Sequence, residues 1–166
     1  MSTRFNAKEI FAMGVEIEAN GKTFYETAAK KSAETSVREF FRELAAWESQ
    51  HIAVFQKMMD ELPPSAGTAD VFDPDGEAEM YLRATADSHV FIRNKDIAGL
   101  VAGCRTAVEI LDVAITFEKD SIVFYTTMKK VVAENLGQGT IDRLIDEELK
   151  HISLLTQRRQ KLAAKA

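Results

Sequence analysis

An internal repeat at an offset of 100 residues constrains the fold of this chain more than any other feature. The segment VEIEANGKTFY at 15–25 aligns without a gap with ITFEKDSIVFY at 115–125. The identities continue in the same register: Glu18 pairs with Glu118, Phe24 with Phe124, Tyr25 with Tyr125, Leu44 with Leu144, Glu48 with Glu148, His51 with His151 and Ile52 with Ile152. A repeat of this kind indicates a duplicated helical hairpin and not a short-period solenoid.

The prolines divide the chain in the same way. All three lie in one central segment, at 63, 64 and 74. Because proline breaks the interior of a helix, the proline-free ranges 1–62 and 75–166 favour helices on both sides of a central connection. Three helix starts carry the pattern of a capping box, and these are Asn6 with Glu9, Ser36 with Glu39, and Thr106 with Glu109. We expect the second helix to end near Asp60.

These boundaries predict an all-α chain that folds as a single domain over residues 1–166. A first hairpin would cover about 6–60, a crossover 61–104, and a second hairpin about 105–164. A crossover of this length is rarely structureless, and EAEMYLRATADS at 77–88 is a candidate short helix, preceded by Asp73-Pro74 as its cap. Two hairpins joined by a long crossover make a four-helix bundle.

Composition excludes several classes of function. A formal net charge of −5 gives no electrostatic footprint for nucleic acid. No stretch longer than eight residues lacks a charge, so we expect no membrane-spanning helix. The segment MSTRFNAKEI has no apolar core, so we expect no secretory signal there. Cys104 is the lone cysteine, which excludes an intramolecular disulfide and a multi-cysteine metal site. We therefore expect a soluble, cytoplasmic protein.

One glutamate of each long helix falls on the apolar face. Residues three and four apart share a helix face, so Glu148 lies in one stripe with Leu144, His151 and Ile152, whereas Glu147 points elsewhere. The same spacing places a glutamate on the apolar stripe of each other helix. The polar residues on the four stripes are Glu18, Glu48, His51, Glu118, Glu148 and His151.

Four buried carboxylates require compensation. Burying an ionised carboxylate without a partner costs several kcal/mol, and neighbouring carboxylates repel one another. The stripes carry no lysine or arginine, but two divalent cations would balance four glutamates. Each Glu-x-x-His places a carboxylate and an imidazole on one face, one helical turn apart. The sequence therefore predicts a dinuclear metal site, and the alternative is a buried, hydrogen-bonded polar network.

The position of the fourth helix follows from the same site. In an antiparallel hairpin, residues equidistant from the turn lie side by side. Glu118 therefore meets Glu148 only if the fourth helix begins early, near Asn135. The helix preference of Gly137 and Gly139 favours a start after Gly139 instead. Within the range 135–141 we expect the early start.

The pattern of these six residues resembles that of a known protein family. A glutamate on each of two helices and Glu-x-x-His on each of the other two resembles the ferritin-like di-iron carboxylate superfamily. The segments IEANGKTFY, FEKDSIVFY and DEELKHI are most similar to its rubrerythrin-type branch. The resemblance implies a ferritin-like fold and two bound iron ions, with manganese or a mixed pair as alternatives. It implies that the metal ligands are Glu18, Glu48, His51, Glu118, Glu148 and His151.

Within that set, the resemblance implies that Glu48 and Glu148 bridge the two metals and that Glu18 and Glu118 are terminal ligands. Rubrerythrin proper has one further glutamate, one turn after the third-helix ligand, where this chain has Ser121. The remaining six-ligand set is closer to that of bacterioferritin.

The resemblance also bears on partners. Rubrerythrin proper carries a rubredoxin domain with four cysteines, which this sequence lacks, so we expect an external electron donor such as a rubredoxin-like protein. Bacterioferritin uses a short fifth helix in its cage, and no residues are left over for one. This disfavours a 24-subunit storage shell. Because most soluble oligomers are small and symmetric, we expect a homodimer or another small homo-oligomer, with no nucleic-acid or membrane partner.

Three functions remain open. The resemblance favours a di-iron oxidoreductase that reduces hydrogen peroxide or dioxygen. A ferroxidase that handles or stores iron would use the same ligands. The third alternative is of a different class, a non-catalytic interaction protein whose metal is structural.

Further predictions concern residues outside the ligand set. Tyr25 and Tyr125 lie two turns after a ligand and are either hydrogen-bond partners of the metal site or core tyrosines. Trp47 precedes a ligand and is expected to pack between helices. In the crossover, His89 is expected to be a surface or hydrogen-bonded histidine.

Three further residues are expected to lie outside the site. Cys104 is expected to be a small buried residue. Glu16 and Glu147 lie off the metal stripe and are expected to be surface acids.

Overall fold

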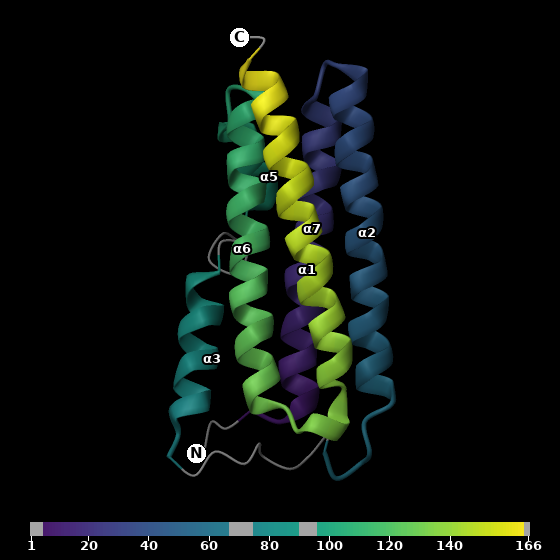
Figure 1. Cartoon of the computed structure of the whole chain (residues 1–166), viewed down its shortest axis with the longest axis vertical. Helices are drawn as coiled ribbons and strands as arrows, with labels where there is room; N and C mark the ends of the chain where they lie inside the picture. The colour runs from purple at the N-terminus through teal and green to yellow at the C-terminus, as the bar shows by residue number, and fades with distance from the viewer. Residues whose placement is uncertain (1–4, 67–74, 90–95, 165–166) are drawn as a thin grey trace.

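The computed structural model describes residues 5–66, 75–89 and 96–164. Four long helices run side by side along the molecule (Figure 1). They are α1 (Ala7–Lys31), α2 (Thr35–Asp60), α6 (Ala107–Val131) and α7 (Gln138–Ala163). The pairs α1–α2 and α6–α7 are the two hairpins, and the apolar faces of all four helices enclose one core. The all-α four-helix bundle predicted from the sequence is confirmed.

Two of the predicted helix starts are confirmed by their caps. The side chain of Asn6 accepts a hydrogen bond from the amide of Glu9, and the Glu9 carboxylate accepts one from the amide of Asn6, both at 2.9 Å. At the start of α6, Thr106 Oγ1 accepts from the amide of Glu109 at 3.1 Å. The Glu109 carboxylate accepts from the Arg105 amide instead of closing the capping box.

The predicted capping box at Ser36 is wrong. Helix α2 begins at Thr35, and the capping residue before it, Glu34, makes no side-chain hydrogen bond to the helix. The Ser36 hydroxyl instead donates a hydrogen bond to the Glu34 carboxylate at 2.6 Å, and it does not cap the helix. The predicted end of this helix at Asp60 is confirmed.

The fourth helix begins between the two predicted positions. Asn135 lies in a single 3-10 turn, η1 (Glu134–Leu136), and not in the α-helix. Gly137 follows with a φ of +105°, a left-handed conformation that glycine adopts without steric cost, and α7 starts at Gln138. The expected start near Asn135 is therefore wrong, because the chain needs a tight turn before it enters the helix. Gly139 lies inside α7.

The described part of the crossover contains two short helices. The predicted helix is α3 (Glu77–Ser88), which packs along α6. The second, α5 (Ile97–Gly103), was not predicted and packs against α1. There the Lys31 ammonium donates to the carbonyl oxygens of Val101, Ala102 and Cys104, which satisfies the C-terminal end of α5. The proposed cap at 73–74 lies outside the described residues.

The duplication extends to burial. From 10 to 28, each residue is buried, half-buried or exposed as is the residue 100 positions later, in 110–128. The two halves therefore direct equivalent positions at the same core. Cys104 is buried, as expected. None of the helices in the described ranges is both long and apolar enough to cross a membrane.

Candidate metal centre

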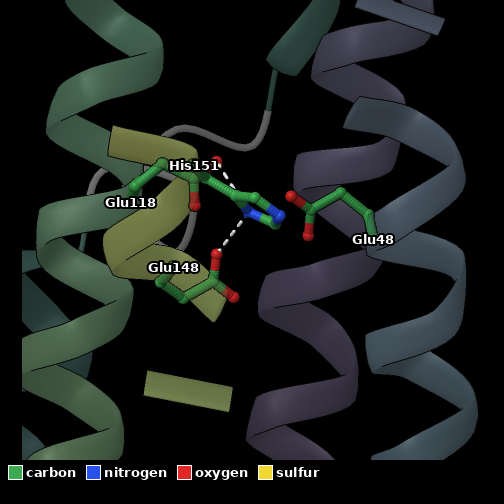
Figure 2. A group of neighbouring side chains, drawn as sticks. All are labelled: Glu48, Glu118, Glu148 and His151. Carbon is green, nitrogen blue, oxygen red and sulfur yellow. Dashed lines mark hydrogen bonds and ion pairs between the residues drawn. The ribbon is translucent and has the colours of Figure 1, made fainter. Parts of the chain in front are cut away.

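The structure brings the six predicted ligands together inside the bundle. Figure 2 shows Glu48 reaching from α2 toward three residues on α6 and α7. All six side chains are buried: Glu18 on α1, Glu48 and His51 on α2, Glu118 on α6, and Glu148 and His151 on α7. Their burial follows from the stripes on which the sequence places them.

The potential ligand atoms form two groups that share a member, and in each group they all lie within 4.8 Å of one another. The first group is Glu48, Glu118, Glu148 and His151, and the second is Glu18, Glu48 and His51. Glu48 belongs to both groups. Glu148 also approaches both histidines, because its Oε1 lies 2.9 Å from His51 Nδ1 and its Oε2 lies 2.8 Å from His151 Nδ1. Glu48 and Glu148 thus occupy the positions that bridging carboxylates would need.

Several buried polar atoms of this cluster make no hydrogen bond to the described residues. They are both carboxylate oxygens of Glu18 and of Glu48, Oε2 of Glu118, Oε1 of Glu148 and Nδ1 of His51. The last two atoms lie close together but without the alignment of a hydrogen bond. Buried polar atoms nearly always have a partner. Carboxylate oxygens and imidazole nitrogens gathered in this way fit divalent cations.

The electrostatics of the cluster show the same need for positive charge. Burial raises the pKa of Glu18, Glu48 and Glu118 well above the ordinary value, and repulsion from neighbouring carboxylates raises it further. Burial acts in the same direction on Glu148, but its close contacts with the two histidines outweigh burial and lower the pKa. Burial would lower the pKa of His51, yet the adjacent Glu148 carboxylate raises it to about 9. Metal binding would displace the protons that these shifts retain.

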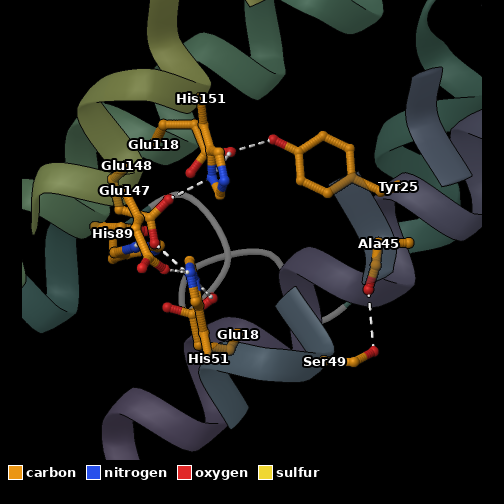
Figure 3. A network of polar contacts seen from close by, with 11 residues as sticks. Glu18, Tyr25, Ala45, Ser49, His51, His89, Glu118, Glu147, Glu148 and His151 are labelled. Carbon is orange, nitrogen blue, oxygen red and sulfur yellow. Dashed lines mark hydrogen bonds and ion pairs between the residues drawn. The ribbon is translucent and has the colours of Figure 1, made fainter. Parts of the chain in front are cut away.

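Each histidine also contacts a residue of the opposite hairpin. His51 Nε2 lies 2.9 Å from Oε2 of Glu147 (Figure 3). Glu147 is exposed, as expected of a surface acid, but its carboxylate also reaches a candidate ligand, a contact that the sequence did not predict. His151 instead stacks on Trp47, with the ring centroids 4.8 Å apart and the planes 5° from parallel. Glu16 is exposed, as expected.

The two equivalent tyrosines differ. The Tyr25 hydroxyl donates to Oε1 of Glu118 at 2.5 Å. Burial and the charge of Glu118 raise the pKa of Tyr25 well above the ordinary value, so it stays protonated. The hydroxyl of Tyr125 is equally buried but makes no hydrogen bond within the described part of the chain. Tyr25 therefore supports a candidate ligand, whereas Tyr125 is a core tyrosine.

The crossover contributes a buried histidine beside the cluster. His89 is fully buried, and its Nε2 lies 3.2 Å from Oγ of Ser121 on α6. Of the two predicted environments, the hydrogen-bonded one is confirmed. Burial lowers the pKa of His89 to about 4, so its imidazole is neutral near neutral pH. In the first hairpin, the position equivalent to Ser121 is Gly21. A Cβ added there would lie 2.6 Å from the Phe117 ring.

On its histidine side, the centre borders a surface pocket between α2 and α7. A pocket of about 350 Å³ is lined by both histidines together with Trp47, Glu147 and Lys150. The histidine side of the cluster is thus the side from which a small molecule or an ion can approach.

Comparisons with known proteins agree with this arrangement. The sequence profile of the rubrerythrin family matches residues 9–93, just over half of the chain. In fold, the chain is similar to a protein from Thermotoga maritima described as a ferritin-like diiron-carboxylate protein, with a TM-score of 0.68 and 24% sequence identity. That similarity covers 96% of this chain and 98% of the other and supports the predicted ferritin-like fold. A comparison with curated proteins found no significant match. The chain belongs to the rubrerythrin family, as the profile match shows, and its helical bundle and carboxylate–histidine cluster agree with that assignment.

Proposed function

We propose that this protein is a di-iron oxidoreductase that reduces hydrogen peroxide with electrons from a separate donor. The observation that carries the proposal is the cluster of buried carboxylate and imidazole atoms that lack hydrogen bonds within the described residues. A purely structural polar network would satisfy these atoms internally.

The residues divide between two metal positions. Glu18 and His51 would hold one ion, Glu118 and His151 would hold the other, and both bridging carboxylates would lie between them. When bound, two ferrous ions would supply one electron each for cleavage of the O–O bond. Four carboxylates balance two divalent charges, so the loaded centre would carry no net charge into the apolar core.

The surrounding residues have separate tasks. Tyr25 holds the Glu118 carboxylate through its hydroxyl and remains protonated because of its burial. Fully buried aromatic side chains fill the core of the bundle and exclude water from it, among them Phe11, Phe55 and Phe117. The pocket beside the histidines gives a small oxidant a route to the centre.

Reduction of peroxide also needs a supply of electrons. The sequence contains a single cysteine, Cys104, which cannot form a rubredoxin-type iron site. We therefore propose a rubredoxin-like protein as the donor. As the working unit we propose a homodimer or small homo-oligomer, the commonest kind of assembly among soluble proteins.

The proposal is tested by loading the protein with Fe(II) without oxygen, measuring metal per chain, and following oxidation by H₂O₂ and by O₂ separately. About two irons per chain, oxidised much faster by peroxide, are expected. The Glu48→Ala variant should lose this behaviour, whereas Glu43→Ala, an exposed glutamate on the same helix, should retain it.

Other outcomes identify the alternatives. Faster oxidation by O₂, with many irons retained per chain, would replace the proposal with a ferroxidase. Metal content that Glu48→Ala leaves unchanged would contradict the dinuclear centre. Manganese preferred over iron in competition would keep the centre but change its chemistry, since the same ligands suit both metals.

A further inference from the structure

The two halves of the centre differ at one pair of equivalent positions. Each histidine is contacted by the residue that directly precedes the bridging glutamate of the opposite hairpin. For His51 this residue is Glu147 (Figure 3). For His151 it is Trp47. Positions 47 and 147 correspond in the repeat, so the same geometry holds a carboxylate on one side and an indole on the other.

This difference changes how each imidazole is held. The Glu147 carboxylate accepts a hydrogen bond from Nε2 of His51. The other ring nitrogen, Nδ1, then faces the cluster, 3.4 Å from Oε2 of Glu18 and 2.9 Å from Oε1 of Glu148. A carboxylate on the outer nitrogen of a metal-binding histidine fixes its tautomer and ring orientation and raises its basicity.

Stacking acts differently on the other histidine. Trp47 restricts the plane of the His151 ring, but an indole face accepts no conventional hydrogen bond from the outer nitrogen. Among the described residues, Nε2 of His151 has no hydrogen-bond partner comparable to Glu147. The tautomer of His151 is therefore set only by its contact with the cluster itself, through Nδ1 and Glu148.

We propose that Glu147 is a positioning residue that directs the first divalent cation to the His51 half of the centre. Trp47 leaves the His151 half as the weaker position, so the two metals bind in order. This inference rests on the proposed dinuclear centre and deepens it, because the exchange of two neighbouring side chains makes a symmetric ligand set unequal.

Titration of the metal-free, full-length protein with Co(II) tests the order of binding. Calorimetry measures the affinity of each step, and the visible absorption of Co(II) reports the ligand geometry. Two steps are expected for the unaltered chain. Glu147→Gln should weaken the first step by about 10- to 100-fold, the usual effect of removing such a partner, and leave the second step unchanged.

Two further variants separate positioning from charge. Asp146→Asn removes one negative charge from the adjacent, exposed position and should leave both steps unchanged. Trp47→Glu supplies His151 with the carboxylate that it lacks and should strengthen the second step until the two steps approach each other.

A second readout does not depend on the order of binding. In the Zn(II)-loaded protein, the imidazole N–H of His51 should exchange slowly with solvent in NMR, and Glu147→Gln should accelerate this exchange. Circular dichroism checks that each variant is folded, and Glu147→Asp, which shortens the side chain but keeps the charge, should give an intermediate loss of first-step affinity.

The outcomes are distinct. Two equal steps in the unaltered chain, or equal losses from Glu147→Gln and Asp146→Asn, would overturn the positioning role while leaving the dinuclear centre intact. If the unaltered protein binds no Co(II), the centre itself fails and the proposed function fails with it.

Discussion

The hairpins α1–α2 and α6–α7 present the same candidate ligands to one core but surround them differently. Both supply one glutamate from the first helix and Glu-x-x-His from the second. Around these residues the pairs diverge: Gly21 corresponds to Ser121, and Trp47 corresponds to Glu147. Even Tyr25 and Tyr125, which are identical, differ in hydrogen bonding.

The difference shows which positions the physics of the core holds fixed. A carboxylate inside an apolar bundle is tolerated only with compensating charge, so a change at one of the four glutamates unbalances the whole cluster. A residue next to a ligand has no such constraint, and several side chains can fill its space. The repeat therefore preserves the ligands while their neighbours differ.

The largest expected effect comes from removing a shared ligand instead of one that belongs to a single group. Glu48 lies in both groups of ligand atoms, whereas Glu18 lies in one. Glu48→Ala should abolish binding of both metals, and Glu18→Ala should spare one, as measured by metal analysis after Fe(II) loading. Equal metal content in the two variants would contradict the bridging position of Glu48.

The next effect concerns His89, which the crossover places against the second hairpin. Its pKa lies near 4 in the folded protein instead of 6.5, because burial disfavours the charged imidazole. The unfolded chain therefore binds the proton first, and stability is lost as the pH falls from about 6.5 to about 4. The shift corresponds to about 3 kcal/mol in the free energy of unfolding.

Chemical denaturation of the metal-free protein across that pH range measures this loss. The buried glutamates also titrate, so the loss is read as the difference from His89→Asn, which cannot take up the proton. If the two chains lose stability in parallel, His89 is not held neutral by the fold.

How far the sequence predicted this arrangement can be judged residue by residue. The six clustered residues could be found because their spacing and the repeat act within single helices, and the caps at Asn6 and Thr106 are equally local. Glu147 was missed because its contact with His51 depends on the distance between hairpins, which helix periodicity does not contain. His89 faces Ser121 for a similar reason, since the path of the crossover is not encoded in a repeat.

A substitution at Gly21 tests whether the first hairpin tolerates a side chain at the position where the second hairpin has Ser121. An added Cβ at Gly21 would lie 2.6 Å from the Phe117 ring and 3.2 Å from Oε2 of Glu48, closer than normal contact. Gly21→Ala should therefore lower the free energy of unfolding by about 1–3 kcal/mol, the usual cost of overpacking, in spite of the better helix propensity of alanine.

Gly103 provides a matched control, because no atom lies within 4 Å of a Cβ built there. Gly103→Ala lies at the end of the short helix α5 and should change stability little. A stabilised Gly21→Ala protein in thermal denaturation would show that Phe117 moves aside without cost.

The smallest effect separates the two tyrosines. Tyr25→Phe removes the donor to Glu118 and should cost about 1–3 kcal/mol in the free energy of unfolding of the metal-free protein, because a buried carboxylate oxygen loses its partner. Tyr125→Phe removes a buried hydroxyl that has no hydrogen bond among the described residues, so it should be neutral or slightly stabilising. Both changes delete one oxygen from a fully buried ring, which makes each variant the control for the other. Urea denaturation at neutral pH measures the difference, and equal costs would show that the Tyr125 hydroxyl finds a partner in solution and that the two hairpins support the centre alike.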